Sequence, residues 1–192
     1  GNDLTLHARR SARMGALTRR TLKRANGLLA DTQRDIRLAR QWGLGEEKPA
    51  EVLPGGGGVD LVEIERLRGM TDALPVALPA DLPLVINPRG FRPGSVRNDT
   101  FFQAIPLVLE RLPDVHFVCP GMAGQPEALK WVERFHLQER VSLLPFLTQA
   151  QLWGLFQRAA VTVSVSQHDG TPNTLLEAMA CGCFPVAGDI ES

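Results

Sequence analysis

Residues 161–187, VTVSVSQHDGTPNTLLEAMACGCFPVA, contain the pattern that decides the fold. An apolar, β-branched run at Val161–Val165 is followed by a polar loop, and a second apolar run at Phe184–Ala187 ends the stretch. Between them, 172–181 has the composition of a helix, with proline at its first position and Gly182 just beyond its last. This order predicts two parallel strands joined by a helical crossover.

The same alternation of short apolar runs and helix-like runs extends back to residue 82. Strands that are buried on both faces of a parallel sheet are typically apolar throughout, as most of these runs are. The pattern therefore predicts an α/β fold, a Rossmann-like three-layer α/β/α domain with a parallel sheet. The other predicted strands are Leu84–Asn87, Val115–Cys119 and Val141–Leu143, and the other predicted helices are Thr100–Arg111, Pro126–Phe135 and Gln149–Arg158.

A glycine-rich stretch separates this pattern from the first part of the chain. Residues 49–60, PAEVLPGGGGVD, hold four consecutive glycines, which are costly inside a helix or a strand and predict a loop or hinge. Several prolines follow the hinge and predict a weakly structured connector. We therefore predict three segments, namely 1–60, the connector 61–82 and the α/β domain 83–192.

The first segment begins with a strongly basic stretch. Alanine, leucine and methionine between the cations predict a helix over 9–24. The few and small apolar positions favour an ordinary solvated helix face, and the alternative is contact with an anionic membrane surface. A short strand at Gly27–Ala30 and a helix from a cap at Asp31-Thr32 through Leu44 are predicted next. The basic residues are Arg9, Arg10, Arg13, Arg19, Arg20, Lys23 and Arg24.

Composition narrows the partners and the cellular location. The formal net charge is +0, which gives no electrostatic case for nucleic acid, and no apolar run reaches the length of a membrane span. The three cysteines lack a framework spacing, which favours reduced thiols that pack as small hydrophobes over metal or redox chemistry. We expect a cytoplasmic protein, with a peripheral position at the inner membrane surface as the alternative. Both ends of the chain have the character of cuts rather than natural termini.

The loop and helix at 166–177 have the residues of an anion site. Thr171 suits the N-cap, so the first free N–H groups fall near Asn173 and Thr174, where a phosphate is the usual guest. Glu177 lies one turn further on the same face, about 6 Å along the axis, at a spacing that suits two ribose hydroxyls. An ordinary solvated glutamate is the alternative, which the apolar neighbours weaken. Gly170 permits close approach to a ligand.

Two residues at the mouth of this loop have two equally supported interpretations. His168 and Asp169 suit contact with a sugar hydroxyl or with positive charge that develops at a reacting carbon. A surface turn holding His-Asp-Gly for its own geometry explains them as well.

A second polar loop follows the predicted strand Leu84–Asn87. Arg89, Arg92 and Arg97 have no acid between them, and guanidinium groups suit bidentate contact with phosphate oxygens. Asn98 or Asp99 is the expected cap of the next helix. Together with the 166–177 loop, these arginines would clamp a diphosphate and replace a metal ion. The chain contains no Asp-x-Asp, so we expect no divalent metal and no cofactor beyond a nucleotide substrate.

The stretch from Ser166 to Val186 resembles the signature of the group 1 glycosyltransferases, a family of retaining enzymes with the two-domain GT-B fold. That signature is a Glu, seven residues, a second Glu, and then Ala-x-Ala-x-Gly-x-Pro-Val. Here Glu177-Ala-Met-Ala-Cys-Gly-Cys-Phe-Pro-Val186 follows its tail, with one extra residue before the proline. The resemblance implies the end of an N-terminal, acceptor-side domain followed by an incomplete C-terminal domain that binds the donor.

The resemblance also implies roles for particular residues. Glu177 would hold the ribose, and Asp169 stands at the position of the family's first Glu as the candidate catalytic residue that touches the donor sugar. The donor would be a nucleoside-diphosphate sugar, and the acceptor is unknown. The residues implied for the diphosphate and sugar are Arg89, Arg92, Arg97, His168, Gly170, Thr171, Asn173 and Thr174, and those on the nucleobase side are Leu144, Pro145 and Phe146.

Three functions fit these features. The first is a metal-independent glycosyltransferase of hexosyl type, of which this chain would be an inactive piece. The second is a nucleotide-binding module without transferase activity, which the Asp at 169 favours slightly. The third is another GT-B enzyme, such as a sugar-nucleotide epimerase.

Overall fold

The computed structural model describes residues 3–53, 58–69, 74–92, 94–167, 169 and 172–190. Internal contacts divide the chain into two compact units. The first comprises 1–58 with the short stretches 168–173 and 189–192, and the second comprises 59–167 and 174–188. The predicted segments 1–60, 61–82 and 83–192 stay a prediction, because contacts alone do not show which piece folds by itself.

The first unit packs helices beside two short strands. Ser11 and Thr32 each accept a hydrogen bond from the backbone of the first helical turn that follows them. The predicted basic helix is present but begins at Ala12, and the second strand is an addition to the predicted elements. The elements are η1 (Asp3–His7), α1 (Ala12–Arg24), β1 (Leu28–Ala30), α2 (Gln33–Trp42) and β2 (Ala50–Val52), with β1 and β2 parallel.

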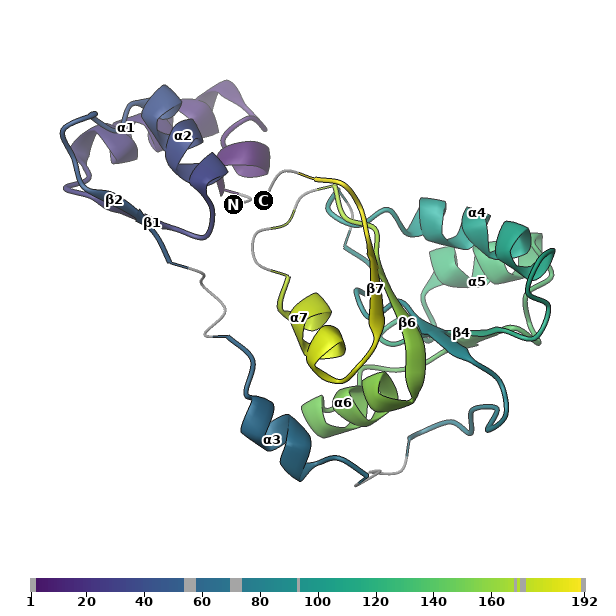
Figure 1. The fold of residues 1–192 in the computed structure, drawn as a ribbon. Helices are drawn as coiled ribbons and strands as arrows, with labels where there is room; N and C mark the ends of the chain where they lie inside the picture. The colour runs from purple at the N-terminus through teal and green to yellow at the C-terminus, as the bar shows by residue number, and fades with distance from the viewer. Residues whose placement is uncertain are drawn as a thin grey trace. The chain divides into compact units, whose positions relative to one another are not determined.

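The second unit is built on a five-stranded parallel sheet in the order β5-β4-β3-β6-β7 (Figure 1). All five predicted strands are present, which confirms the Rossmann-like α/β prediction. The strands are β3 (Leu84–Ile86), β4 (His116–Cys119), β5 (Val141–Leu143), β6 (Ala159–Ser164) and β7 (Phe184–Ala187). The helices are α3 (Leu61–Arg66), α4 (Asn98–Leu109), α5 (Pro126–Arg134), α6 (Gln149–Arg158) and α7 (Asn173–Ala180).

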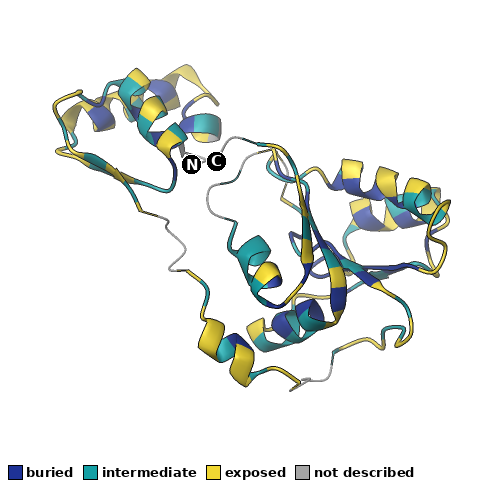
Figure 2. Cartoon of the chain, in the orientation of Figure 1, coloured by how far each residue is buried: buried dark blue, intermediate teal, exposed yellow. Residues whose placement is uncertain are grey.

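Helices cover both faces of this sheet, so its central strands are buried (Figures 1 and 2). On one face, Phe101 and Phe102 of α4 and Val132 of α5 form a core with Phe117 of β4. On the other face, α3, α6 and α7 pack against Leu84, Ile86, Val118 and Leu144, among others. Each central strand therefore needs apolar side chains on both faces of the sheet. This is the physical reason that the strands could be predicted from apolar runs in the sequence.

The order of the strands creates a switch point between β3 and β6. From β3 the chain runs outward to β4 and β5, and then returns to β6 on the opposite side of β3. Beyond the strand ends, Val96 and Ser166 form an antiparallel bridge, and Gln167 N donates to Ser95 O over 2.7 Å. Ligands of open parallel sheets bind at such a switch point, so the two loops that the sequence singles out lie where a site is expected.

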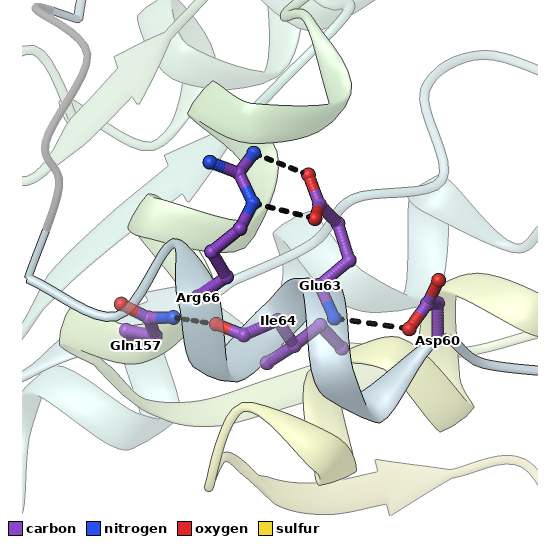
Figure 3. A network of polar contacts seen from close by, with 5 residues as sticks. All are labelled: Asp60, Glu63, Ile64, Arg66 and Gln157. Carbon is purple, nitrogen blue, oxygen red and sulfur yellow. Dashed lines mark hydrogen bonds and ion pairs between the residues drawn. The ribbon is translucent and has the colours of Figure 1, made fainter.

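The connector prediction is wrong for residues 61–66, which form α3. Asp60 caps this helix by accepting a hydrogen bond from Glu63 N over 2.9 Å, and Arg66 pairs with the Glu63 carboxylate through two hydrogen bonds (Figure 3). Ile64 is buried in the core, and its carbonyl accepts a hydrogen bond from Gln157 of α6. The prolines on which the prediction rested lie after this helix, and α3 is stabilised by burial of Ile64.

The cysteines are buried, as predicted. Burial raises the pKa of Cys183 to about 12, with a smaller contribution from Cys181. The Cys183 thiol donates to the carbonyl oxygens of Phe156 and Ala159, at 3.0 and 3.2 Å. A protonated, enclosed thiol packs as a small hydrophobe. Among the described helices, none is both long and apolar enough to cross a membrane.

Candidate functional site

The turn after β3 is held by a pair of buried asparagines. Asn87 is 2% exposed and donates through Nδ2 to Asn98 Oδ1 over 3.1 Å. Asn98, 4% exposed, donates in turn to the carbonyl oxygen of Gly90 over 2.8 Å. Asn87 Oδ1 also accepts a hydrogen bond from Arg89 N, at 3.3 Å. Because each amide bonds to the backbone of the turn, the backbone of Arg89 is fixed by groups that are shielded from water.

Arg89 joins the two loops that the sequence predicts to form the site. Its side chain is buried, with the residue 8% exposed, and its Nη1 donates to Thr174 Oγ1 over 3.3 Å. Thr174 lies in the first turn of α7, where unpaired N–H groups and the positive end of the helix dipole favour an anion. The guanidinium charge and the start of this helix therefore lie together at the carboxyl edge of the sheet.

The other two arginines of this loop are exposed. Arg97 forms two hydrogen bonds with the Asp99 carboxylate, at 2.8 and 2.7 Å, and this pairing raises the pKa of Arg97 and lowers that of Asp99. The predicted cap at Asn98 or Asp99 is wrong, because both are helical residues of α4 and Arg97 occupies the cap position without a side-chain hydrogen bond. The amide of Asn98 instead holds the turn after β3, and Asp99 is occupied by Arg97.

Glu177 lies one turn along α7 from the start of the helix. Its Oε2 accepts a hydrogen bond from Gln149 Nε2, the first residue of α6, over 2.9 Å. The apolar neighbours of Glu177 suggest a buried helix, but Ala178 is its buried residue and Met179 is 49% exposed. Glu177 is itself half-buried, so its carboxylate is accessible to a ligand. Gln149 was not among the predicted site residues.

The predicted nucleobase side lies where the loops after β4 and β5 meet. Leu144 is buried, whereas Pro145 is exposed and the Phe146 residue is 85% exposed. Gly121 N donates to Pro145 O over 3.1 Å, and a Cβ on Gly121 would lie 3.0 Å from the Phe146 ring. With its φ of +73°, position 121 suits glycine, which lets the ring lie against the backbone. An exposed aromatic face results at the same edge of the sheet.

The turn after β3 reaches this aromatic loop. A Cβ on Gly90 would lie 3.9 Å from the carbonyl oxygen of Gly121, so the turn that carries Arg89 runs beside the loop after β4. A guanidinium from the loop after β3, the start and a carboxylate of α7, and an aromatic face from the loop after β5 thus belong to one unit. This set offers partners for a phosphate, for a pair of hydroxyls and for a flat ring.

The remaining predicted site residues belong to the stretch 166–174. His168, Gly170 and Thr171 lie outside the described residues. The backbone oxygen of Asp169 accepts a hydrogen bond from Arg34 Nη2 over 3.0 Å within the first unit. Asn173 begins α7, one residue later than predicted, and its buried Oδ1 has no hydrogen-bond partner among the described residues. The roles of these residues stay predictions, as do those of the other predicted site residues.

With its parallel sheet and its loops joined at the switch point, the second unit is of the Rossmann-like class. Residues 91–192, more than half of the chain, match the family model of the glycosyl transferases group 1. The chain belongs to this family. No curated protein matches the sequence significantly.

Solved structures of GT-B proteins share the fold at low sequence identity. S. aureus TarM, solved as a mutant with fondaparinux, alpha-GlcNAc-glycerol and UDP, is 17% identical with a TM-score of 0.69, over 94% of this chain and 33% of that one. Sucrose-phosphate synthase from Thermosynechococcus elongatus is 18% identical with a TM-score of 0.69, and the match covers 96% of this chain and 46% of that one. Anabaena HepE, in complex with UDP-glucose, is 19% identical with a TM-score of 0.68, and the match covers 92% of this chain and 49% of that one. The chain therefore spans a third to about half of these proteins.

Proposed function

We propose that this chain provides the donor site of a glycosyltransferase that moves a hexosyl group from a nucleoside-diphosphate sugar to an acceptor. The observation that carries the proposal is the contact between Arg89 and Thr174, 3.3 Å long, which brings a guanidinium to the start of α7. A departing diphosphate needs positive charge at that place. Glu177, further along the same helix, is the proposed ribose partner.

The proposed chemistry is retaining and needs no metal ion. Arg89 and the free N–H groups of α7 would stabilise the negative charge that develops on the diphosphate as the bond to the sugar breaks. Arg92, Arg97, His168, Gly170 and Thr171 are proposed to complete the contacts to the diphosphate and sugar. Asp169 is proposed as the group that touches the donor sugar, with Asn173 beside it. Leu144, Pro145 and Phe146 are proposed to face the base.

Calorimetric titration of the chain with UDP tests this proposal, because UDP is the nucleotide bound in structures of the same fold. We expect binding that persists in EDTA and that Glu177→Ala weakens by about 10- to 100-fold, while the far-UV circular dichroism spectrum is retained. Unchanged affinity in Glu177→Ala contradicts the ribose role, and binding that requires added Mg²⁺ contradicts metal independence. A transfer assay with candidate acceptors, in which NMR reads the anomeric configuration of the product, tests retention and separates transfer from the module and epimerase alternatives.

We also propose a peripheral position at the cytoplasmic face of a membrane, carried by α1. Arg13, Arg20 and Arg24 are exposed and spaced by seven and four residues, so they form one outward stripe on this helix. Such a stripe favours anionic headgroups. Sedimentation with vesicles of phosphatidylcholine containing anionic phosphatidylglycerol should pull down the wild type at low salt but not a variant with all three arginines changed to Gln. Equal sedimentation of both proteins would contradict this position.

A further inference from the structure

Glu177 is only half-buried, and a glutamate side chain loses considerable rotational freedom when it is held in one orientation. A carboxylate that accepts hydrogen bonds from two neighbouring hydroxyls has to turn both of its oxygens toward them. The contact that can set this orientation comes from α6, whose first residue, Gln149, donates to Glu177 Oε2 over 2.9 Å.

The start of α6 is itself held in place. Thr148 Oγ1 accepts a hydrogen bond from Gln151 N over 3.2 Å, and Gln151 Oε1 accepts one from Thr148 N over 3.0 Å. This reciprocal capping box fixes the backbone on both sides of Gln149. Below it, Trp153 and Phe156 anchor α6 in the core. The backbone that carries Gln149 is therefore fixed, and its exposed side chain reaches Glu177 from the end of α6.

The chemistry of an amide suits this position. Its N–H donates to the carboxylate, yet the group adds no charge, so the full negative charge of Glu177 stays available to a ligand. A glutamate at 149 would instead place a second carboxylate against the first. The glutamine bonds to Oε2 through one N–H and leaves lone pairs on both oxygens of Glu177, which is enough for a pair of hydroxyls.

We propose that Gln149 is a positioning residue, which orients the Glu177 carboxylate so that the site prefers a ribose over a 2′-deoxyribose nucleotide. The inference rests on the proposed function, because it takes the nucleotide as the ligand of Glu177. It adds a residue from a different helix that acts through Glu177 and need not touch the nucleotide. The ribose is distinguished because two adjacent hydroxyls can engage an oriented carboxylate, whereas a 2′-deoxyribose offers one.

Calorimetric titrations with UDP and with 2′-deoxy-UDP test the inference. We expect Gln149→Ala to weaken UDP binding by about 10-fold, the scale of one hydrogen bond to a charged group, and to weaken 2′-deoxy-UDP binding clearly less. Gln149→Glu should weaken UDP binding further, because like charges repel. Gln103→Ala, the same change at an exposed position of α4, is the matched control and should leave both affinities unchanged.

A second background separates positioning from a general effect on the fold. In a Glu177→Ala protein, titrated at the higher concentrations that weak binding requires, adding Gln149→Ala should cause no further loss of UDP affinity. An equal loss in both backgrounds, equal losses for the two nucleotides, or no loss in the wild-type background would each overturn the inference. Failure of the wild type to bind UDP would overturn the proposed function as well. If the wild type binds UDP and the variants behave otherwise than expected, only the role of Gln149 is overturned.

Discussion

The two ends of the candidate site are built in different ways. At the phosphate end, Arg89, Asn87 and Asn98 are all buried, with buried hydrogen bonds at the two asparagines and a partly buried one between Arg89 and Thr174. At the ribose and base end, Glu177 is half-buried and Phe146 is 85% exposed. One end is therefore formed by the packing of the unit, whereas the other keeps its binding groups open to solvent.

This difference has an energetic consequence. A buried polar group that loses its partner costs about 1–3 kcal/mol of stability, because it can no longer bond to water. An exposed group that loses its partner bonds to water instead, and the fold loses little. Changes at the phosphate end should therefore affect both stability and binding, and changes at the other end should affect binding alone.

The largest effect at the phosphate end is expected from Arg89→Met. The variant fills a similar volume but removes the charge that we propose to meet the diphosphate. Hydrogen bonds to charged groups contribute about 1.5–3 kcal/mol, so UDP affinity should fall by about 10- to 100-fold. Arg89→Lys keeps the charge but loses the planar guanidinium, so its loss of UDP affinity should be clearly smaller. Calorimetry measures the UDP affinity of both variants, and wild-type affinity in Arg89→Met would show that Arg89 does not bind the diphosphate.

Asn98→Ala should be the most destabilising change at the site. It leaves the buried Nδ2 of Asn87 and the Gly90 carbonyl without their partners, at a cost of about 1–3 kcal/mol. Urea unfolding followed by circular dichroism measures this loss, with Gln103→Ala as the exposed control on the same helix. Asn98→Asp tests the direction of the bonds, because a carboxylate cannot donate to Gly90 O. Equal stability of wild type and Asn98→Ala would mean that the turn does not depend on the amide pair.

Structure could be predicted from the sequence wherever a segment's own residues determine it. The buried strands are recognisable as apolar runs, and Gly182 ends α7 with a φ of +98°, as its position just past the helix predicts. The strand β2, Ala50–Val52, is short and contains a glutamate, so its pattern gives no strand signal. The ion pair of Arg97 was foreseeable, since Asp99 lies two residues further on.

Contacts between distant segments could not be predicted in this way. Gln149 and Glu177 lie on two different helices, and only the packing of α6 and α7 against one face of the sheet brings them together. The same holds for Asn87 and Asn98, whose residue types alone suggest a turn and a helix cap. The residue types at the site were therefore predictable, whereas the residues that orient them were not.

A smaller effect is expected from Phe146→Ala at the open end. The exposed ring contributes little to folding, so the unfolding free energy should stay close to that of the wild type. If the ring stacks on the base, its loss should weaken UDP binding by about 3- to 10-fold, since aromatic pairs contribute roughly 0.5–1.5 kcal/mol. Phe184→Ala, at an exposed phenylalanine of β7, is the matched control. The same titration with ribose 5-phosphate, which has no base, should show no effect of Phe146→Ala.

The smallest effect is expected at Arg97, which shares a loop with Arg89 but lies on the surface. To meet a diphosphate it must leave Asp99, so its net contribution is reduced by the ion pair that it gives up. We expect Arg97→Ala to weaken UDP binding by about 2- to 3-fold, and Asp99→Asn to strengthen it by a similarly small factor. Calorimetry at pH 7 measures both, and an Arg97→Ala loss as large as that of Arg89→Met would break the distinction between the buried and exposed arginines.

The pH dependence of stability gives an independent check on the same ion pair. Hydrogen bonding to Arg97 lowers the pKa of Asp99 below its ordinary 3.8. The unfolded chain then binds the proton more readily than the folded protein, so the stabilisation is fully present above about pH 4 and is lost as the pH falls through the lowered pKa. The wild type should therefore be slightly more stable than Arg97→Ala in urea at pH 6, and the gap should close toward pH 2. A gap that persists at pH 2 would show that Arg97 stabilises the loop through packing and not through the charge of Asp99.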